Sequence, residues 1–485
     1  MDCNIKTNIK KGRITMKRLV SILLVLVLAI GMCTMAGCNK NNGGASANFV
    51  VPEGGYDGSE VTIKFAHTMG AKLQEVLDAH IVEFNKLYPK IHIEHESYGG
   101  WGDIAGLINT EIAGGNQPNI AYCYPDHVAM YNLAKAVVTL DNLMASEIVT
   151  NRADGTTETL GLTQAQIDDF IDGFYNEGKQ YGDGLMYTMP LSKSTEVLYY
   201  NKTFFEKNKL SVPTTWEEME ELCAKILALD PKSVPLGYDS EDNWFITMCE
   251  QNGTPYTSAT GEKYLFDNAE NKALVKQVRE WYQKGYVTTE ALFGAYTSGL
   301  FTELDPEKSH SYMCIGSSGG ASYQIPKNDA FEVGVAPIPQ ADANNKKVIS
   351  QGPSLCVLKG NNISDQEIVA SWLFVKYLTT NMAFQTEFSS TSGYMPVLES
   401  AQNEPTYKAW LDKANGSSFL TALVVRVGLE QADNYFTSPA FNGSSVARKQ
   451  VGALLAKCMS EKTDNVDALL DQAFRDAVDE CTFLG

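Results

Sequence analysis

Residues 187–219 read YTMPLSKSTEVLYYNKTFFEKNKLSVPTTWEEM, and this stretch carries a dense series of start and stop signals for local structure. The run from Thr195 to Tyr200 predicts a short buried strand, and Thr203 is expected to begin a helix. Thr214 and Thr215, followed by glutamate three residues on, predict a second, capped helix. Upstream, Asp183-Gly184 predicts a hairpin turn and a β-ribbon that leads into the stretch. The succession of strand, helix and capped helix indicates that an α/β lobe begins here.

The region before this stretch shows the alternation of strand and helix that is typical of a parallel sheet. Residues 61–66 predict a strand, residues 73–84 a helix that Pro89 stops, and residues 91–94 the next strand. A second unit of the same kind ends with a predicted strand over residues 119–124. Parallel sheets of this kind place their ligand loops at the carboxyl ends of the strands. Trp101 and Asp126 fall at such positions.

The order of several motifs resembles a known family. The motifs are FAHTMG (65–70), GGNQPNIAYCYPD (114–126), SGYMPV (392–397) and FNGSSVAR (441–448). Together with residues 187–219 they resemble the bacterial extracellular solute-binding proteins of ABC importers, in the sugar and glycerol-3-phosphate group that includes maltose-binding protein. The resemblance covers roughly residues 60–482. It implies a two-lobed α/β fold of the periplasmic-binding-protein type, with a ligand cleft between the lobes and three crossover segments. The implied lobes are 59–192 with 352–396, and 193–351 with 397–485.

The amino terminus has the layout of a secretory signal. Residues 1–37 are expected to be a signal peptide that starts at Met16, with Lys17-Arg18 before the apolar run 19–30. Ala-Gly before Cys38 resembles a bacterial lipobox, which implies that Cys38 carries the lipid. The alternative is an uncleaved anchor, but the apolar run falls short of the ~20 residues that span a bilayer. Residues 38–58 are rich in Asn, Gly and Ser and predict a flexible tether.

Composition limits the partners. The formal net charge is −19, and loss of residues 1–37, with six basic and one acidic residue, changes it to −24. Such an acidic surface argues against nucleic acid and against electrostatic docking on anionic lipid, so the membrane is reached only through the lipid anchor. The seven cysteines beyond Cys38 have no ligand-like spacing and predict buried thiols, with a disulfide left open. We expect a monomer with no cofactor, no metal and no catalytic residue.

Each candidate ligand-binding residue also has a possible structural role. Sugars need aromatic platforms and planar polar groups, and Trp101 and Trp244 are candidates for stacking, against surface exposure for the first and core packing for the second. Asp126 matches an acidic position of the family that meets ligand hydroxyls, and it could instead cap a helix. The hydroxyls of two residues in the first crossover segment could hydrogen-bond the ligand, or they could hydrogen-bond backbone groups at the hinge. Those residues are Ser194 and Thr195, and alignment with the family adds Ser318 and Gly352.

Arg448 is the most diagnostic charge in the sequence. If Ser444 or Ser445 caps the following helix, Arg448 lies in the first turn, where the helix dipole disfavours a cation. The glycerol-3-phosphate binder of the family has an arginine at the matching place, and Tyr394 matches its ligand tyrosine. Such an arrangement suits a phosphate or carboxylate. The residues before Arg448 depart from that protein, however, and Arg448 could instead bond sugar hydroxyls or a carboxylate such as Asp126.

The sequence contains no HExxH, no Walker loop and no GxGxxG after a strand, and its histidines have no ligand-like spacing. We therefore predict an extracellular lipoprotein that binds a mono- or oligosaccharide and delivers it to the transmembrane subunits of an ABC permease by hinge closure. The alternative ligand is glycerol-3-phosphate or a glycerophosphodiester for the same type of importer. Remote alternatives are a secreted glycoside hydrolase, with two carboxylates at its site, and a lipid-anchored adhesin.

Overall fold

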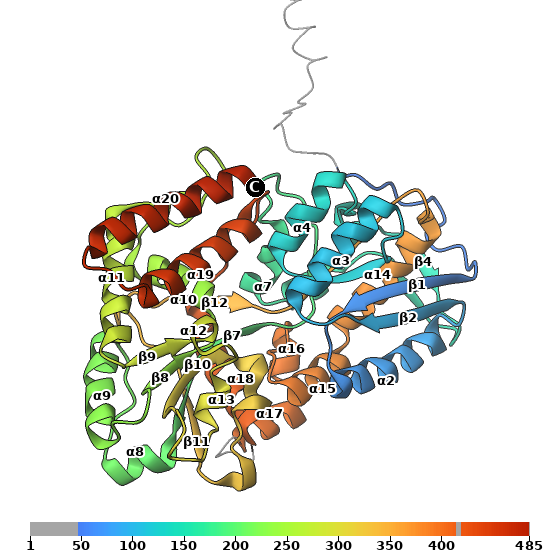
Figure 1. Ribbon diagram of the computed structural model, residues 1–485. Helices are drawn as coiled ribbons and strands as arrows, with labels where there is room; N and C mark the ends of the chain where they lie inside the picture. The colour runs from blue at the N-terminus through green and yellow to red at the C-terminus, as the bar shows by residue number, and fades with distance from the viewer. Residues whose placement is uncertain (1–46, 414–418, 485) are drawn as a thin grey trace, which may run out of the picture. The chain divides into compact units, whose positions relative to one another are not determined.

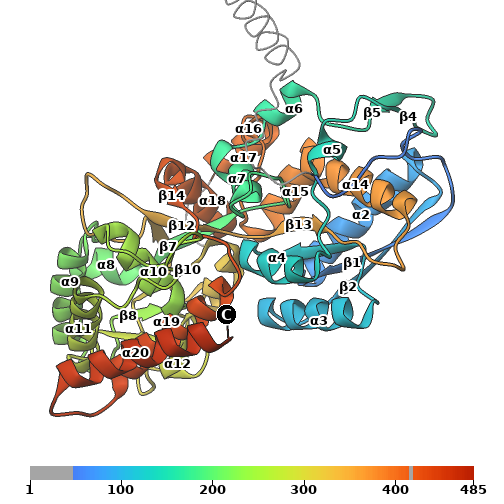
Figure 2. The same cartoon turned by 90° about the horizontal axis from the view of Figure 1, so that it is seen from above.

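The computed structural model describes residues 47–413 and 419–484. The predicted signal peptide and Cys38 lie outside these residues. The described chain forms two main sheets, each flanked by helices (Figures 1 and 2). Each sheet contains strands from segments that are far apart in the sequence, so the chain passes between the sheets more than once. The described residues contain no helix long and apolar enough to cross a membrane.

The first sheet has five strands in the order β2-β1-β3-β13-β6. The first three are parallel, and β13 runs antiparallel to both of its neighbours. Figure 2 shows α3 on one face of this sheet and α2 and α14 on the other. The bounds are β1 (Val61–His67), α2 (Ala71–Leu87), β2 (Ile91–Ser97), α3 (Trp101–Gly114), β3 (Ile120–Cys123), β6 (Met189–Pro190), β13 (Ser354–Val357), α14 (Asp365–Thr380) and α15 (Met382–Ser392).

Helix α2 shows how the sequence pattern produces this layer. Leu77, Ile81 and Phe84 recur at helical spacing and are buried. The helix ends at Leu87 because Pro89 disfavours the helical conformation in the residue before it, and Tyr88 has left that conformation. The predicted strand, helix and strand at the start of the chain are therefore confirmed.

The second sheet has the order β14-β12-β7-β10-β8-β9, and β11 also pairs with β7. Strand β7 is the predicted buried strand. The predicted capped helix is confirmed as α9, whose Thr215 side chain accepts a hydrogen bond from the backbone N–H of Glu218. Helix α19 packs against α10, α11 and α20 beside this sheet (Figure 1). The bounds are β7 (Ser194–Asn201), α8 (Lys202–Asn208), α9 (Trp216–Leu229), β8 (Leu236–Tyr238), α10 (Glu241–Asn252), α11 (Ala269–Gln283), β9 (Val287–Thr289), β10 (Met313–Ser317), β11 (Val333–Ala336), β12 (Val348–Gln351), β14 (Tyr435–Phe436), α19 (Ser444–Ser460) and α20 (Val466–Leu484).

Shorter elements connect these layers. A small hairpin of β4 and β5 stands apart from both sheets. Helix α18 packs against η3 and β7 of the second layer and also against α15 of the first. The bounds are α4 (Pro125–Tyr131), η1 (Asn132–Ala134), α5 (Asp141–Met144), β4 (Val149–Asn151), β5 (Thr157–Thr159), α6 (Gln164–Asp168), α7 (Asp172–Asn176), η2 (Glu177–Lys179), α12 (Glu290–Phe293), α13 (Ser298–Phe301), η3 (Ser318–Gln324), η4 (Lys327–Asp329), α16 (Glu399–Gln402), α17 (Pro405–Asp412), α18 (Leu420–Glu430) and η6 (Ala432–Asn434).

Three short segments carry the chain from one layer to the other. The first lies between β6 and β7, the second between β12 and β13, and the third contains Met395, which forms an isolated antiparallel bridge with Lys193. Gly352 in the second segment has φ +106°, and a Cβ there would lie 2.8 Å from the Cα of Lys193. Only glycine allows the first and second segments to approach so closely.

Lys193 joins all three crossover segments. Its backbone N–H donates to the Met395 carbonyl at 3.1 Å, and the Met395 N–H donates back at 2.6 Å. Its Nζ lies 2.5 Å from Glu177 Oε1 and donates to Ser354 Oγ at 3.0 Å. The lysine side chain is fully buried and the glutamate side chain is 2% exposed. This buried ion pair therefore sits at the point about which the two layers are connected.

Two sequence predictions are wrong in this part of the molecule. Asp183-Gly184 lies in a turn, but no strands flank it, because η2 precedes it and the chain continues without pairing to β6. The predicted tether is too long at its carboxyl end. Phe49 is buried in the core of the first layer, and the Asn48 side chain donates to the Val137 carbonyl at 2.8 Å. Contacts of one apolar and one amide side chain thus anchor a segment whose composition suggested only flexibility.

The cysteine prediction is confirmed for the part of the chain that the structure describes. The seven cysteines there are free thiols, and all are buried. They pack as small apolar side chains in both layers.

Candidate functional site

A cavity of about 580 Å³ lies between the two sheets, at the carboxyl ends of their strands. From the first layer, Thr68 follows β1, Trp101 follows β2 and Tyr124 follows β3. The second layer contributes residues at the ends of β8, β10 and β12. The cavity is lined by Thr68, Gly99, Gly100, Trp101, Tyr124, Glu196, Asp239, Ser240, Asn243, Glu290, Tyr296, Ser298, Gly316, Ser317, Gly319, Gly320, Tyr323, Gln324, Gln351 and Tyr394.

An aromatic stack forms the wall from the first layer. The ring of Trp101 lies 4.0 Å from that of Tyr124 and 5.2 Å from that of Tyr122, and both pairs are stacked. Trp101 is the first residue of α3 and stays partly exposed. Two tyrosines of the second layer also line the cavity, and Tyr296 is 63% and Tyr323 75% exposed. The cavity therefore offers apolar faces on both sides.

Tyr394 enters the cavity from the third crossover segment. Its ring rests against the backbone of η3, because a Cβ added at Gly319 would lie 2.8 Å from the ring atom Cζ. Gly319 thus makes room for the ring. Burial raises the pKa of the Tyr394 hydroxyl to about 12, so the phenol is neutral and available as a hydrogen-bond donor.

Carboxylates line the wall from the second layer. Glu196 is buried, and it accepts hydrogen bonds from the Tyr238 hydroxyl at 2.5 Å and from Asn243 Nδ2 at 2.9 Å. Burial raises its pKa to about 7 although both hydrogen bonds oppose the rise. Burial and the charges of nearby carboxylates raise the pKa of Glu290 to about 7 as well, and burial raises that of Asp239. Lysine, arginine and histidine are missing from the described residues that line this cavity.

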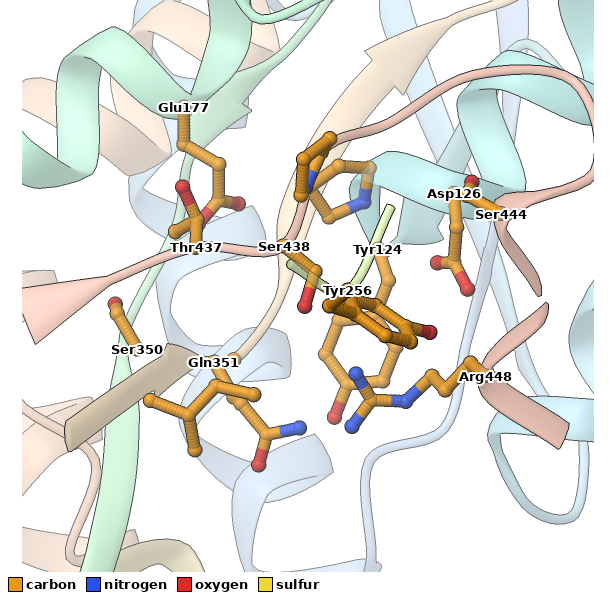
Figure 3. Close-up of a pocket in the computed structure, with 14 residues that line it drawn as sticks. Tyr124, Asp126, Glu177, Tyr256, Ser350, Gln351, Thr437, Ser438, Ser444 and Arg448 are labelled. Carbon is orange, nitrogen blue, oxygen red and sulfur yellow. The ribbon is translucent and has the colours of Figure 1, made fainter. Parts of the chain in front are cut away.

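A second, smaller cavity of about 50 Å³ adjoins the first and shares Tyr124 and Gln351 with it. Figure 3 shows Asp126, from the start of α4, and Arg448, from α19, on the two sides of this space, with the ring of Tyr256 between them. Gly352 also lines it. The small cavity therefore brings together an acid of the first layer and a base of the second.

Arg448 is held by partners within its own layer. Its Nε lies 2.6 Å from Asp242 Oδ2, and its guanidinium also donates to the side-chain oxygen of Asn243. Burial acts against its charge, but Asp242 and then Asp126 outweigh burial and raise its pKa. Helix α19 begins at Ser444 with Gly443 as the cap, so Arg448 lies just beyond the first turn. The compensating group that the sequence required is thus chiefly Asp242.

Residues 79–415 match the sequence profile of a family described as bacterial extracellular solute-binding protein. The match spans more than half of the chain. The chain belongs to the bacterial extracellular solute-binding proteins. Members of this family bind the solute for an ABC importer, as the sequence motifs predicted.

Curated relatives of this solute-binding protein carry the name sn-glycerol-3-phosphate-binding periplasmic protein UgpB. The protein from Escherichia coli O1:K1 / APEC is 25% identical over 381 residues, which cover 74% of this chain and 80% of the relative. The protein from Salmonella typhimurium matches at the same identity and coverage.

Solved structures share the fold of this solute-binding protein. UgpB from Mycobacterium tuberculosis in complex with glycerophosphocholine aligns with a TM-score of 0.69 and 18% identity, over 87% of this chain and 98% of that one. The cyclic alpha-maltosyl-1,6-maltose binding protein from Arthrobacter globiformis aligns with a TM-score of 0.67 and 18% identity, over 88% and 100%. The predicted two-lobed α/β fold is confirmed. These structures hold a phosphodiester in one case and are named for a sugar in the other, so fold alone does not choose the ligand.

Five of the nine residues predicted to bind ligand line the two cavities of this solute-binding protein. Trp101 and Tyr394 line the larger cavity. Asp126, Gly352 and Arg448 line the smaller one. Asp126 also accepts a hydrogen bond from the backbone N–H of His127 at 3.1 Å, so it is both a cavity residue and part of the start of α4.

The prediction for Trp244 is wrong. Its side chain is fully buried in the core of the second layer, where it stacks on Tyr238 at 4.7 Å and on Trp216 at 5.8 Å. The start of α10 points its first turn toward the cleft, and Trp244 lies one residue past Asn243, which does line the cavity. One step along a helix turns a side chain by about 100°, and here that step separates cleft from core.

The hydroxyl-bearing residues predicted as ligand contacts lie in buried positions, where Thr195 and Ser318 make hydrogen bonds with backbone groups. Thr195 Oγ1 donates to the Ile349 carbonyl at 2.8 Å, and the Thr195 N–H donates to Ser318 Oγ at 3.3 Å. Ser194 is buried in β7, where it pairs with Gln351 in the register of β12. None of these three described residues lines either cavity. Their prediction as ligand contacts is corrected: they hold two strands and η3 together.

Sequence reasoning missed most of the second-layer wall, and it also missed Tyr124 of the first layer. Asn243, Gln351 and Tyr124 each lie within a quoted or neighbouring motif, directly before Trp244, in the second crossover and before Asp126. Gln351 ends β12 and Tyr124 follows β3, so position at a strand end was a usable signal for these two residues. Asp239 and Glu290 also follow strands directly, but β8 and β9 are three residues long and were not predicted, and Gln324 ends a 3₁₀ helix.

Proposed function

We propose that this solute-binding protein captures a carbohydrate outside the cell and delivers it to an ABC permease. The observation that supports the proposal most is the lining of the larger cavity. It combines a stacked tryptophan and tyrosines with carboxylate and amide groups, and the described lining contains no cation. Sugars have apolar C–H faces that stack on aromatic rings and hydroxyls that donate to carboxylates.

A phosphate ester suits this lining less well. Its charge would face Glu196, Asp239 and Glu290 across a cavity without a counter-ion. Arg448 is close by, but Asp242 already neutralises it. The names of the relatives keep glycerol-3-phosphate and its diesters as the second candidate, because Arg448 would be the group to bind them.

Hinge closure is the proposed mode of capture. Contacts to one ligand from both layers would favour the closed arrangement, since a ligand shifts an equilibrium by its difference in affinity for the two states. Trp101 and Tyr124 on one side and Asp239 and Asn243 on the other could make such contacts.

A thermal-shift screen tests the proposed function. Mono- and oligosaccharides are compared with glycerol-3-phosphate and glycerophosphocholine, and a ligand at about 100 times its Kd should stabilise the folded state by about 2.7 kcal/mol. We expect sugars to raise the melting temperature and the phosphate compounds to leave it unchanged. A rise with glycerol-3-phosphate and none with any sugar would reverse the choice.

Replacing Trp101 with alanine should weaken sugar binding by about 1–2 kcal/mol, because the stacking face is lost. Calorimetry measures the change. Trp410→Ala is the matched control, since that partly exposed tryptophan packs against Tyr407 and lines neither cavity. Equal affinity of the Trp101 variant and the wild type would show that the stack is not a ligand platform.

Arg448→Gln separates the two ligand classes. For a sugar we expect a loss of less than about tenfold and almost no dependence on salt, because the amide keeps part of the hydrogen bonding. For a phosphate ester the loss should be larger and wild-type binding strongly salt-dependent. Arg475→Gln, at an exposed position of α20, controls for the change in net charge. Salt-sensitive binding that collapses only in the Arg448 variant would favour the phosphate.

The lipid anchor is a proposal from the sequence around Cys38. Cys38→Ala should abolish incorporation of labelled palmitate and release the protein or leave an unprocessed precursor, because the thiol is the proposed acylation site. Labelling of growing cells followed by fractionation measures both effects. Equal label in variant and wild type would contradict the anchor.

A further inference from the structure

One wall of the larger cavity consists of hydrogen-bond acceptors. Asp239 follows β8, Glu290 begins α12, and Gln324 ends η3. Figure 1 shows β8 and α12 beside the strands of the second sheet. The wall is opposite in character to the aromatic stack of Trp101 and Tyr124, so the cavity has an apolar side and an acidic side.

The two oxygens of the Asp239 carboxylate have different partners, and Oδ1 has the two short hydrogen bonds. Its Oδ1 accepts from the Thr297 backbone N–H at 2.6 Å and from the Thr297 hydroxyl at 2.7 Å. Its Oδ2 accepts from the Cys314 thiol at 3.9 Å, and the Ser298 backbone also hydrogen-bonds the carboxylate. A Cβ at Gly316 would lie 2.7 Å from Oδ2 and 3.5 Å from Gln324 Nε2. Because Gly316 has no side chain, the Asp239 carboxylate and the Gln324 amide can both lie against its backbone at the cavity wall.

Gln324 contributes an acceptor that the protein does not use. Its side chain is buried, with 2% exposed, and Nε2 donates to Cys314 Sγ at 3.4 Å. Its Oε1 has no hydrogen-bond partner among the described residues. Buried acceptors are normally paired, and this one belongs to a residue of the cavity wall, so it is a candidate acceptor for a donor on the ligand.

The charge on this wall is also unbalanced. Glu196, Asp239 and Glu290 line the cavity, and Glu241 lies near enough to raise the pKa of Glu290. The described Asp, Glu, His and Cys residues form no group that could hold a metal ion. A sugar hydroxyl would supply a donor but no charge, whereas an ammonium group supplies both. A quaternary ammonium carries the charge but has no N–H to give to Gln324.

We propose that the carbohydrate carries a protonated primary amine, seated against Asp239, Glu290 and Gln324. The inference rests on the proposed function, because it takes the sugar ring on the aromatic stack as given. The amine would donate to Asp239 Oδ2 and Gln324 Oε1 while Glu290 balances its charge. The solute class is then amino sugars with a free amine, as monomers or short oligomers.

Calorimetry with matched sugars tests the inference on the purified protein. Each ring is offered with an amine, an N-acetyl or a hydroxyl group at the same carbon, as glucosamine, N-acetylglucosamine and glucose and as their β-1,4-linked dimers. We expect the amine form to bind at least about tenfold more tightly than the other two, on the scale of a charge-assisted hydrogen bond. Its affinity should fall with salt, because the contact is ionic.

Single variants test whether Asp239 and Glu290 cause the preference for the amine form. Asp239→Asn and Glu290→Gln should each lower the affinity of the amine form at least about tenfold and that of the hydroxyl form by a smaller factor. Glu262→Gln, an exposed acid on the same layer, changes the net charge equally and should alter neither affinity. A uniform loss for all three sugars in the cavity variants would show a general role in place of amine recognition.

The outcomes separate this inference from the proposed function. Equal binding of amine and hydroxyl forms, or preference for the N-acetyl form, overturns the amine and leaves the carbohydrate function standing. Binding of glycerophosphocholine or glycerol-3-phosphate with no binding of any sugar overturns both. Absence of binding by the whole sugar panel also overturns both.

Discussion

Lys193→Met should destabilise the protein by about 3–5 kcal/mol. The substitution removes the cation from Glu177, a carboxylate that is almost fully buried, and a buried charge without a partner carries a desolvation cost of this size. It also removes a donor from Ser354. Denaturation in urea, followed by circular dichroism, measures the loss.

Two variants control for this prediction. Lys86→Met breaks the exposed pair with Glu83, where both side chains are more than half exposed, and should cost less than about 1 kcal/mol. The double variant Lys193→Met with Glu177→Gln should recover part of the loss, since no charge is then left buried. A loss below about 1 kcal/mol in the single variant would mean that the pair does not hold the crossover segments.

Glu196→Gln should stabilise the protein at alkaline pH and have little effect near pH 4.5. Burial raises the pKa of Glu196 from 4.5 to about 7 in the folded state. The folded state therefore binds the proton more tightly, and this contribution to stability is present below pH 4.5 and lost as pH rises through 7. The shift is worth on the order of 3 kcal/mol, and glutamine, which does not ionise, keeps it at about pH 8.

Unfolding free energies of the wild type and the Glu196→Gln variant at about pH 5 and about pH 8 measure this effect. The advantage of the variant over the wild type should grow between the two pH values. Glu75→Gln, at an exposed acid on α2, should show no such growth. A constant difference across the range would mean that Glu196 is ionised in the fold without cost.

The sequence predicted the fold well because local and family signals agreed. Periodic apolar residues marked α2, a threonine cap marked α9, and motif order implied two layers with three crossovers. The hairpin predicted at Asp183-Gly184 is absent because a dipeptide that suits a hairpin turn forms a hairpin only where the flanking segments pair as strands. The tether predicted for residues 48–58 was wrong because composition does not reveal that Phe49 packs in the core of the first layer.

The candidate site was predicted less completely. Trp101 and Asp126 follow strands of regular βα units, so their place at the cleft could be predicted. Trp244 failed because its orientation depends on where α10 starts, and Asn243, one residue earlier, faces the cavity in its place. Asp239, Glu290 and Gln324 come together only through tertiary structure, and Gly316 of β10 makes room for Asp239 and Gln324. No local pattern reports such a meeting.

A crystal structure with the tightest ligand of the sugar screen tests the central claim most directly. The account predicts density for a sugar ring against Trp101 and Tyr124, with polar groups toward Asp239, Asn243 or Gln351 of the other layer. Density for the ligand outside this cavity, or a phosphate group bound at Arg448, would contradict the claim.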